Sequence, residues 1–183
     1  MAQPSPGRAA DDLLVEAQRA GDGVEVRARA LIAAPQSLIW EVLTRYDQLP
    51  RFIPGIAKSV VLSRQGSNVT LEQSGEARFL VFSFPINIRL DVSENAQDSV
   101  ASRAVAGNLR RMTGRYDLQP DARGGILLRY SGLIEPDFEL PPLIGTAALR
   151  SMVEQQFTAM VAEIERRAGI PQRIVPALRE APE

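Results

Sequence analysis

The sequence contains no cysteine and no histidine among its 183 residues. Without cysteine there can be no disulfide bond, no thiolate nucleophile and no iron–sulfur or zinc-thiolate site. Without histidine the chain lacks the commonest metal ligand and the usual general base near neutral pH. Serine–histidine, cysteine–histidine and histidine-ligated metal mechanisms are therefore excluded. Any chemistry has to come from carboxylates, tyrosines, arginines, lysine or ordered water, and we expect no metal, no cofactor and no catalytic residue.

An excess of charge of either sign is also lacking, because 21 basic side chains stand against 22 acidic ones. A protein that binds nucleic acid needs a basic excess on one face, so we expect no nucleic-acid partner. The sequence has no run of about eighteen apolar residues, so no helix is expected to span a membrane. Transient contact with a membrane surface stays open.

The first residues, 1–22, lack the apolar segment of a signal peptide and are interpreted as a flexible lead with a short helix-like stretch at 11–18. We expect a cytoplasmic protein, or a periplasmic one if a signal peptide has been removed. Residues 23–169 are interpreted as a single domain and residues 170–183 as a tail.

Apolar residues recur at the spacing of a strand in most of this domain and at the spacing of a helix in its last part. Apolar and polar residues alternate from Val24 to Ile32, which is typical of a half-buried strand. A short amphipathic helix follows Pro35, and residues 46–55 form a compact turn region with one helical turn. Six further strands, separated by turn signals, are predicted at residues 56–64, 69–79, 79–92, 99–106, 111–118 and 126–135. Their short connections imply an antiparallel meander.

The last predicted element is a helix at residues 143–168, because Val153, Phe157, Met160, Val161 and Ile164 recur at helical spacing. The fold class is therefore α+β: a seven-stranded curved antiparallel sheet wrapped around a long C-terminal helix, with two short helices after the first strand. The helix is the only large apolar surface that can cover the sheet. Since its residues 145–148 are small, we expect an apolar cavity beside its N-terminal half.

This order of elements resembles the helix-grip fold of the START-like (SRPBCC) superfamily. More narrowly it is similar to the polyketide cyclase/dehydrase family that includes coenzyme Q-binding proteins. The segments that carry the resemblance are residues 33–35 with 39–44, residues 46–55, residues 105–108 and residues 153–157. The resemblance implies a cavity for a hydrophobic ligand such as a lipid, a polyisoprenoid quinone or a polyketide-like molecule. It carries no catalytic motif, and the fold hosts many functions.

The candidate ligand-binding residues are Trp40, Phe52, Gln73, Phe82, Tyr116, Tyr130, Phe138, Leu149, Val153 and Gln156. Both tyrosines lie on the inward phase of their strands and, like the two glutamines, could direct one polar group at an apolar ligand. Alternatively, each tyrosine ring belongs to the core and its hydroxyl reaches the rim.

Three aromatic side chains, Trp40, Phe52 and Phe82, have two possible roles each. Trp40 and Phe52 either form a lid opposite the loop that contains Phe138 or clasp the short helices to the sheet. Phe82 either lines the entrance or touches a membrane surface, or else it belongs to the core and a dimer contact, and the core is favoured.

Three functions follow. The first is carriage of a hydrophobic small molecule without catalysis, by a monomer or a weak dimer. The second is an enzyme of the cyclase, aromatase or dehydratase type that uses polar residues of the pocket. The third is a ribosome-associated interaction module, against which the balanced charge speaks.

Overall fold

The computed structural model describes residues 13–79, 82–137 and 142–170, in which eight strands form one antiparallel sheet. The strands are β1 (Leu14–Ala20), β2 (Gly23–Ile32), β3 (Ile56–Gln65), β4 (Asn68–Phe79), β5 (Phe82–Asn95), β6 (Ser99–Gly107), β7 (Leu109–Pro120) and β8 (Ile126–Pro136). Their order across the sheet is β1-β2-β8-β7-β6-β5-β4-β3. From β3 to β8 the strands follow one another as a meander, and β1 and β2 close the sheet beside β8.

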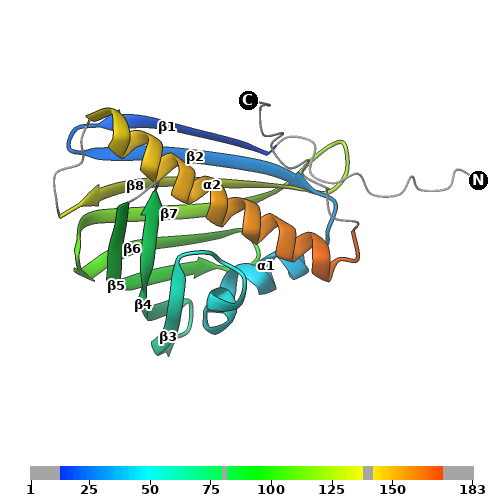
Figure 1. Ribbon diagram of the computed structural model, residues 1–183. Helices are drawn as coiled ribbons and strands as arrows, with labels where there is room; N and C mark the ends of the chain where they lie inside the picture. The colour runs from blue at the N-terminus through cyan, green and yellow to red at the C-terminus, as the bar shows by residue number, and fades with distance from the viewer. Residues whose placement is uncertain (1–12, 80–81, 138–141, 171–183) are drawn as a thin grey trace, which may run out of the picture.

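Helices cover one face of this sheet. The segment between β2 and β3 forms α1 (Gln36–Thr44) and a 3-10 helix, η1 (Tyr46–Arg51). The long helix α2 (Pro142–Arg167) crosses the concave face obliquely, and its C-terminal end lies beside α1 (Figure 1). Within the described residues, no helix is both long and apolar enough to cross a bilayer.

The prediction of seven strands and of a helix at residues 11–18 is wrong, because Leu14–Ala20 is strand β1. This strand forms a hairpin with β2 through Gly21 and Asp22, and Gly21 has a φ of 61°, in the left-handed region that tight hairpin turns require. Val15 is buried under α2, where its carbonyl accepts a hydrogen bond from Arg150 Nε at 3.1 Å.

The β4–β5 hairpin extends beyond both of its neighbours. Strand β3 begins at Ile56, opposite Gly75, and the Glu76 N–H donates a hydrogen bond to the Gly55 carbonyl at 2.9 Å, so among the described strands β4 residues 77–79 pair only with β5. On the other side β6 ends at Gly107, opposite Ile88. Pro85 can therefore lie inside β5, because its missing N–H faces no neighbouring strand, and its carbonyl accepts a hydrogen bond from Asn108 Nδ2 at 2.6 Å.

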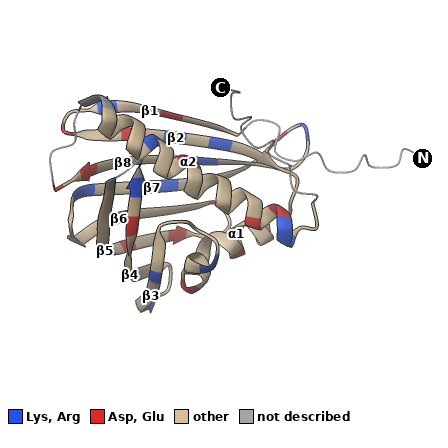
Figure 2. Cartoon of the chain, viewed as in Figure 1, with Lys and Arg blue, Asp and Glu red and all other residues tan. Residues whose placement is uncertain are grey.

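Strand β3 is one edge of the sheet. Its residues Val60, Val61 and Leu62 are exposed, and its pairing with β4 is interrupted by a bulge between Val61 and Ser63. Lys58 and Arg64 flank this apolar run. Elsewhere acidic and basic side chains are interspersed along the strands, without a large area of one sign on the face seen in Figure 2.

A buried tyrosine joins η1 to the sheet. The Tyr46 hydroxyl donates a hydrogen bond to Glu94 Oε1 at 2.8 Å, and Glu94 also accepts two hydrogen bonds from Arg64, at 2.8 and 3.1 Å. Burial, together with the hydrogen bond to Glu94, raises the pKa of Tyr46 above its usual range. The hydroxyl therefore stays protonated and holds η1 against β3 and β5.

Replacing Tyr46 by phenylalanine is expected to lower the free energy of unfolding by about 1.5–3 kcal/mol, because a buried hydrogen bond to a charged group is lost. Chemical denaturation of the variant measures this. A double-mutant cycle with Glu94→Ala isolates the bond, because alanine removes the acceptor. An equal cost of Tyr46→Phe in both backgrounds would mean that the bond contributes nothing.

Candidate functional site

An apolar pocket of about 120 Å³ lies between the concave face of the sheet and the N-terminal half of α2. Its walls come from the start of β3, the extended part of the β4–β5 hairpin, the ends of β7 and β8 that meet there, and α2. The lining residues are Gly55, Ile56, Gln73, Ser74, Gly75, Glu76, Ala77, Arg78, Phe84, Ile86, Ile88, Leu109, Met112, Ile134, Pro136, Ala148, Leu149, Met152 and Gln156. Its position confirms the cavity predicted beside the small residues of the helix, of which Ala148 is one.

Two glycines shape this pocket where β3 meets β4. A β-carbon on Gly75 would overlap the carbonyl oxygen of Gly55, so no larger residue fits without moving the backbone. Gly55 itself has a φ of 83°, in the left-handed region that side chains disfavour. This close approach starts β3 opposite Gly75, and beyond the hydrogen bond that the Glu76 N–H donates to the Gly55 carbonyl, β4 residues 77–79 have no described strand on that side.

A wider groove of about 750 Å³ adjoins the pocket at this unpaired edge. The two hollows share Gly55, Ile56, Met152 and β4 residues 74–78, and the groove continues to Pro54, Asn87 and Gln155. The pocket therefore communicates with the surface between the edge of β4 and α2.

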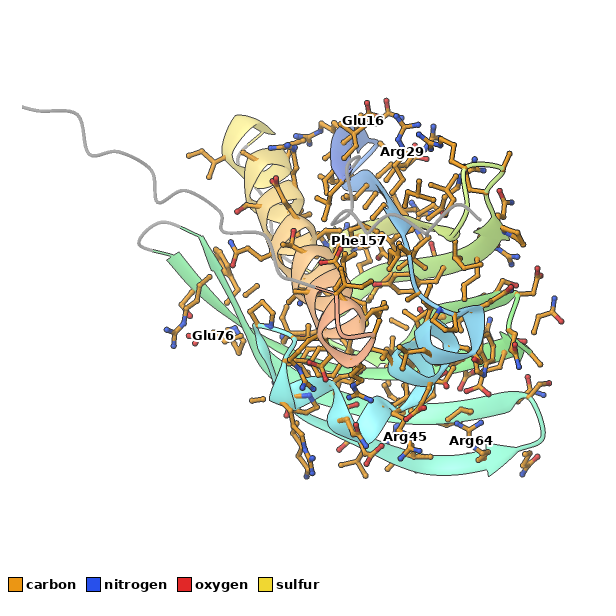
Figure 3. The ribbon with its side chains drawn as sticks, turned by 90° about the vertical axis from the view of Figure 1, so that its right-hand side faces the viewer. Glu16, Arg29, Arg45, Arg64, Glu76 and Phe157 are labelled. Carbon is orange, nitrogen blue, oxygen red and sulfur yellow. The ribbon has the colours of Figure 1, made fainter. Side chains whose placement is uncertain are left out.

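Polar groups in the pocket are few. Gln73, on the inner face of β4, donates a hydrogen bond from Nε2 to the Ser59 hydroxyl at 3.2 Å. Gln156, on α2, donates one from Nε2 to the Pro54 carbonyl at 3.3 Å. Glu76 and Arg78 form an ion pair at 2.6 Å on the outer side of the edge (Figure 3 labels Glu76), and Glu76 also accepts a hydrogen bond from Ser83.

Three of the candidate residues line this pocket: Gln73, Leu149 and Gln156. Val153 is buried in the hydrophobic core instead. The side chain of Phe82 and the whole of Phe138 lie outside the described residues.

Trp40 and Phe52 are absent from the described lining of both the pocket and the adjoining groove. Each is partly buried against the core, and the Phe52 ring faces the guanidinium of Arg167, 6.0 Å away, at the C-terminal end of α2. The Phe52 contact joins the short helices to α2, whereas the predicted clasp joined them to the sheet.

The two inward-facing tyrosines form an aromatic stack with α2 rather than a wall of this pocket. The rings of Tyr116 and Tyr130 are 4.9 Å apart, and the Tyr116 ring is stacked on Phe157 at 6.5 Å. Figure 3 shows Phe157 between α2 and the sheet. Burial raises the pKa of both tyrosines, that of Tyr130 to about 12.

A pair of glycines makes room for the Tyr130 ring. Gly114 and Gly132 are partners across β7 and β8, and a β-carbon on either would meet the ring or hydroxyl of Tyr130. The ring therefore lies flat over this pair.

Sequence reasoning missed most of the apolar wall, including Ile86, Met112 and Ile134. All three lie on the inward phase of their strands, a signal that the alternation of apolar and polar residues provides. What the alternation does not provide is the register between strands, which brings these residues to one place. Among the described residues, no cluster of three acidic side chains could hold a metal ion.

Comparison with known proteins identifies the family. The model of the family described as "Polyketide cyclase / dehydrase and lipid transport" matches residues 32–161. No curated protein matches the chain in sequence.

Solved structures share the fold. A START superfamily protein from Mycobacterium smegmatis superimposes with a TM-score of 0.67 at 16% identity, over 78% of this chain and 98% of that one. A STAR-related lipid transfer protein from Xanthomonas axonopodis gives 0.68 at 16% identity, over 88% and 98% of the two chains. The Zhui aromatase/cyclase from Streptomyces sp. R1128 gives 0.65 at 16% identity, over 84% and 98%.

The narrower similarity to coenzyme Q-binding proteins stays a prediction.

Because the family model covers most of the sequence, and because the sheet wrapped around α2 is the START-like fold, the chain belongs to the polyketide cyclase/dehydrase and lipid transport family.

Proposed function

We propose that the chain binds a hydrophobic small molecule in the pocket beside α2 and carries it without transforming it. The observation that supports this most is the composition of the described lining: apart from Ser74 and the Glu76–Arg78 ion pair at the edge, alkyl and aromatic side chains surround two carboxamides, Gln73 and Gln156. Carboxamides donate and accept hydrogen bonds but do not exchange protons near neutral pH. Such a lining suits retention of an apolar molecule.

The enzymatic alternative depends on Tyr116 and Tyr130, the polar groups that face the interior. Burial raises the pKa of both, so neither phenol ionises near neutral pH to act as a base. Their rings are packed against each other, and the Tyr116 ring is also stacked on Phe157. A structural role accounts for both observations, and this favours carriage over cyclisation.

Filling the pocket tests the proposal. Ala148→Phe places a phenyl ring in a space close to the cavities of about 150 Å³ that bind benzene. We expect the affinity for the uncharged dye N-phenyl-1-naphthylamine to fall about 10- to 100-fold, the equivalent of one displaced apolar group. Native mass spectrometry and organic extraction of the purified wild-type protein identify what it retains.

Ala147→Phe is the matched control, because Ala147 is the neighbouring residue and is exposed. It should bind the dye as the wild type does. A wild-type protein that retains and binds no apolar compound, or an Ala148→Phe variant with unchanged affinity, would refute the proposal.

A further inference from the structure

We propose that the pocket selects molecules whose inserted end is uncharged, is about one six-membered ring in size, and carries a hydroxyl or carbonyl oxygen that hydrogen-bonds to Gln73. This inference rests on the proposed function and narrows it to a ligand class. It combines the position of Gln73, its unused hydrogen-bonding capacity, the placement of the charged residues, and the pocket volume.

Gln73 interrupts an otherwise apolar inner face. Along β4 the inward side chains before it are Val69 and Leu71, both buried, and its partners across the sheet are Ser59 on β3 and Ile88 on β5, also buried. Gln73 lies two residues further into the sheet than Gly75, whereas the unpaired edge begins after Glu76. A molecule that enters past this edge therefore meets the carboxamide with its leading end.

The carboxamide of Gln73 has hydrogen-bonding capacity to spare. It carries two N–H donors and two acceptor lone pairs on its oxygen. One N–H is used by the bond to Ser59, and within the described residues no donor reaches the oxygen. A hydroxyl can donate to this oxygen, and a carbonyl can accept from the second N–H. The Gln73 side chain is half-buried and its oxygen is not sealed from solvent, but a ligand that fills the pocket would exclude water from it. Because a polar group that loses water without gaining a partner is costly, a bound molecule that supplies a partner gains affinity.

Charged groups lie away from this end. Of the lining residues that the structure describes, only Glu76 and Arg78 are charged, and they pair with each other at the exposed edge. An anionic carboxylate or phosphate inserted as far as Gln73 would lose its hydration without meeting a cation, which is strongly unfavourable.

The volume limits the inserted group. At about 120 Å³ the pocket is below the roughly 300–1,000 Å³ of sites that enclose a whole drug-sized ligand. It is close to the cavities of about 150 Å³ that take up benzene. One ring therefore fits inside, and the rest of a longer molecule has to lie in the adjoining groove of about 750 Å³.

Three probes with the same ring and tail separate these requirements: para-heptylphenol, heptylbenzene and para-heptylbenzoate, each competing with the uncharged dye at neutral pH. For the wild type we expect the phenol to bind about 2- to 10-fold more tightly than heptylbenzene, the equivalent of one hydrogen bond. The benzoate should bind at least about tenfold more weakly than the phenol.

Gln73→Leu keeps the approximate size of the side chain and removes its polar atoms. In this variant the affinity for the phenol should fall to that for heptylbenzene, and the affinity for heptylbenzene should stay as in the wild type. Gln119→Leu, an exposed position on β7, is the control and should leave all three affinities unchanged. Thermal melting of Gln73→Leu verifies that the variant is folded.

The outcomes distinguish failure of this inference from failure of the proposed function, which is carriage of a hydrophobic molecule. If heptylbenzene binds but the benzoate binds as tightly as the phenol, the inference is wrong and carriage of apolar molecules stands. If the phenol keeps its advantage in Gln73→Leu, recognition of the oxygen at Gln73 is refuted. If none of the three probes binds, the proposed function fails together with the inference.

Discussion

Raising the pH from about 9 to about 11.5 is expected to lower the free energy of unfolding by about 6 kcal/mol. The folded state raises the pKa of all three tyrosines, Tyr46, Tyr116 and Tyr130, chiefly through burial. The unfolded chain releases these protons near pH 10, whereas the folded chain keeps them. The three tyrosines therefore contribute their full share of the free energy of unfolding below about pH 10. Above that pH, each tyrosine lowers the free energy of unfolding by about 1.4 kcal/mol per pH unit. The contribution of Tyr130 levels off at its folded pKa of about 12.

The composition makes this titration easy to isolate. The sequence has no histidine, no cysteine and a single lysine, Lys58, which is exposed. Stability should therefore be nearly flat between about pH 6 and pH 9, where histidine and cysteine would otherwise titrate.

Urea denaturation at a series of pH values measures the fall, and near-ultraviolet absorbance reports phenolate formation. Tyr116→Phe is the matched variant and should remove about a third of the alkaline loss. Phenolate that forms in the folded protein near pH 10, or a stability that stays constant to about pH 11.5, would contradict the prediction.

Phe157→Ala is expected to lower the free energy of unfolding by about 3–5 kcal/mol. Phe157 is 1% exposed, lies near the middle of α2 and stacks on Tyr116. Its removal leaves a cavity between the helix and the sheet and takes away the ring on which Tyr116 stacks. The melting temperature should fall by about 10 °C or more in a domain of this size.

Phe52→Ala is the comparison, because Phe52 loses the same ring from a partly buried position against the core. It should cost clearly less. Equal losses for the two variants would show that the contact between α2 and the sheet does not dominate stability.

Much of the fold could be predicted because the apolar residues of most long elements recur at the spacing of a strand or of a helix. The seven strands from Val24 onward alternate, and the last helix has an apolar stripe with small residues at its start. Strand β1 was missed because the short run around Leu14 and Val15 does not distinguish one period from the other. This segment is a strand because it pairs with β2 in a hairpin, and the local sequence pattern does not show that pairing.

The site was predicted less well than the fold. The end of α2 that borders the pocket follows from residue size, and Gln73, Leu149 and Gln156 line it. Tyr116 and Tyr130 do face inward, but the opposed glycines Gly114 and Gly132 let the Tyr130 ring lie over them, beside Tyr116. That opposition is set by the register of β7 against β8, which no local pattern encodes.

The edge strand β3 has a consequence for the protein in concentrated solution. Its outer backbone groups have no partner strand, and its exposed Val60, Val61 and Leu62 form a short apolar β-segment of the kind that recruits another chain. The bulge after Val61 and the cation at Lys58 oppose such recruitment, whereas the charge of Arg64 is paired with Glu94. Self-association should therefore begin at β3, and it should strengthen as salt screens the charge of Lys58.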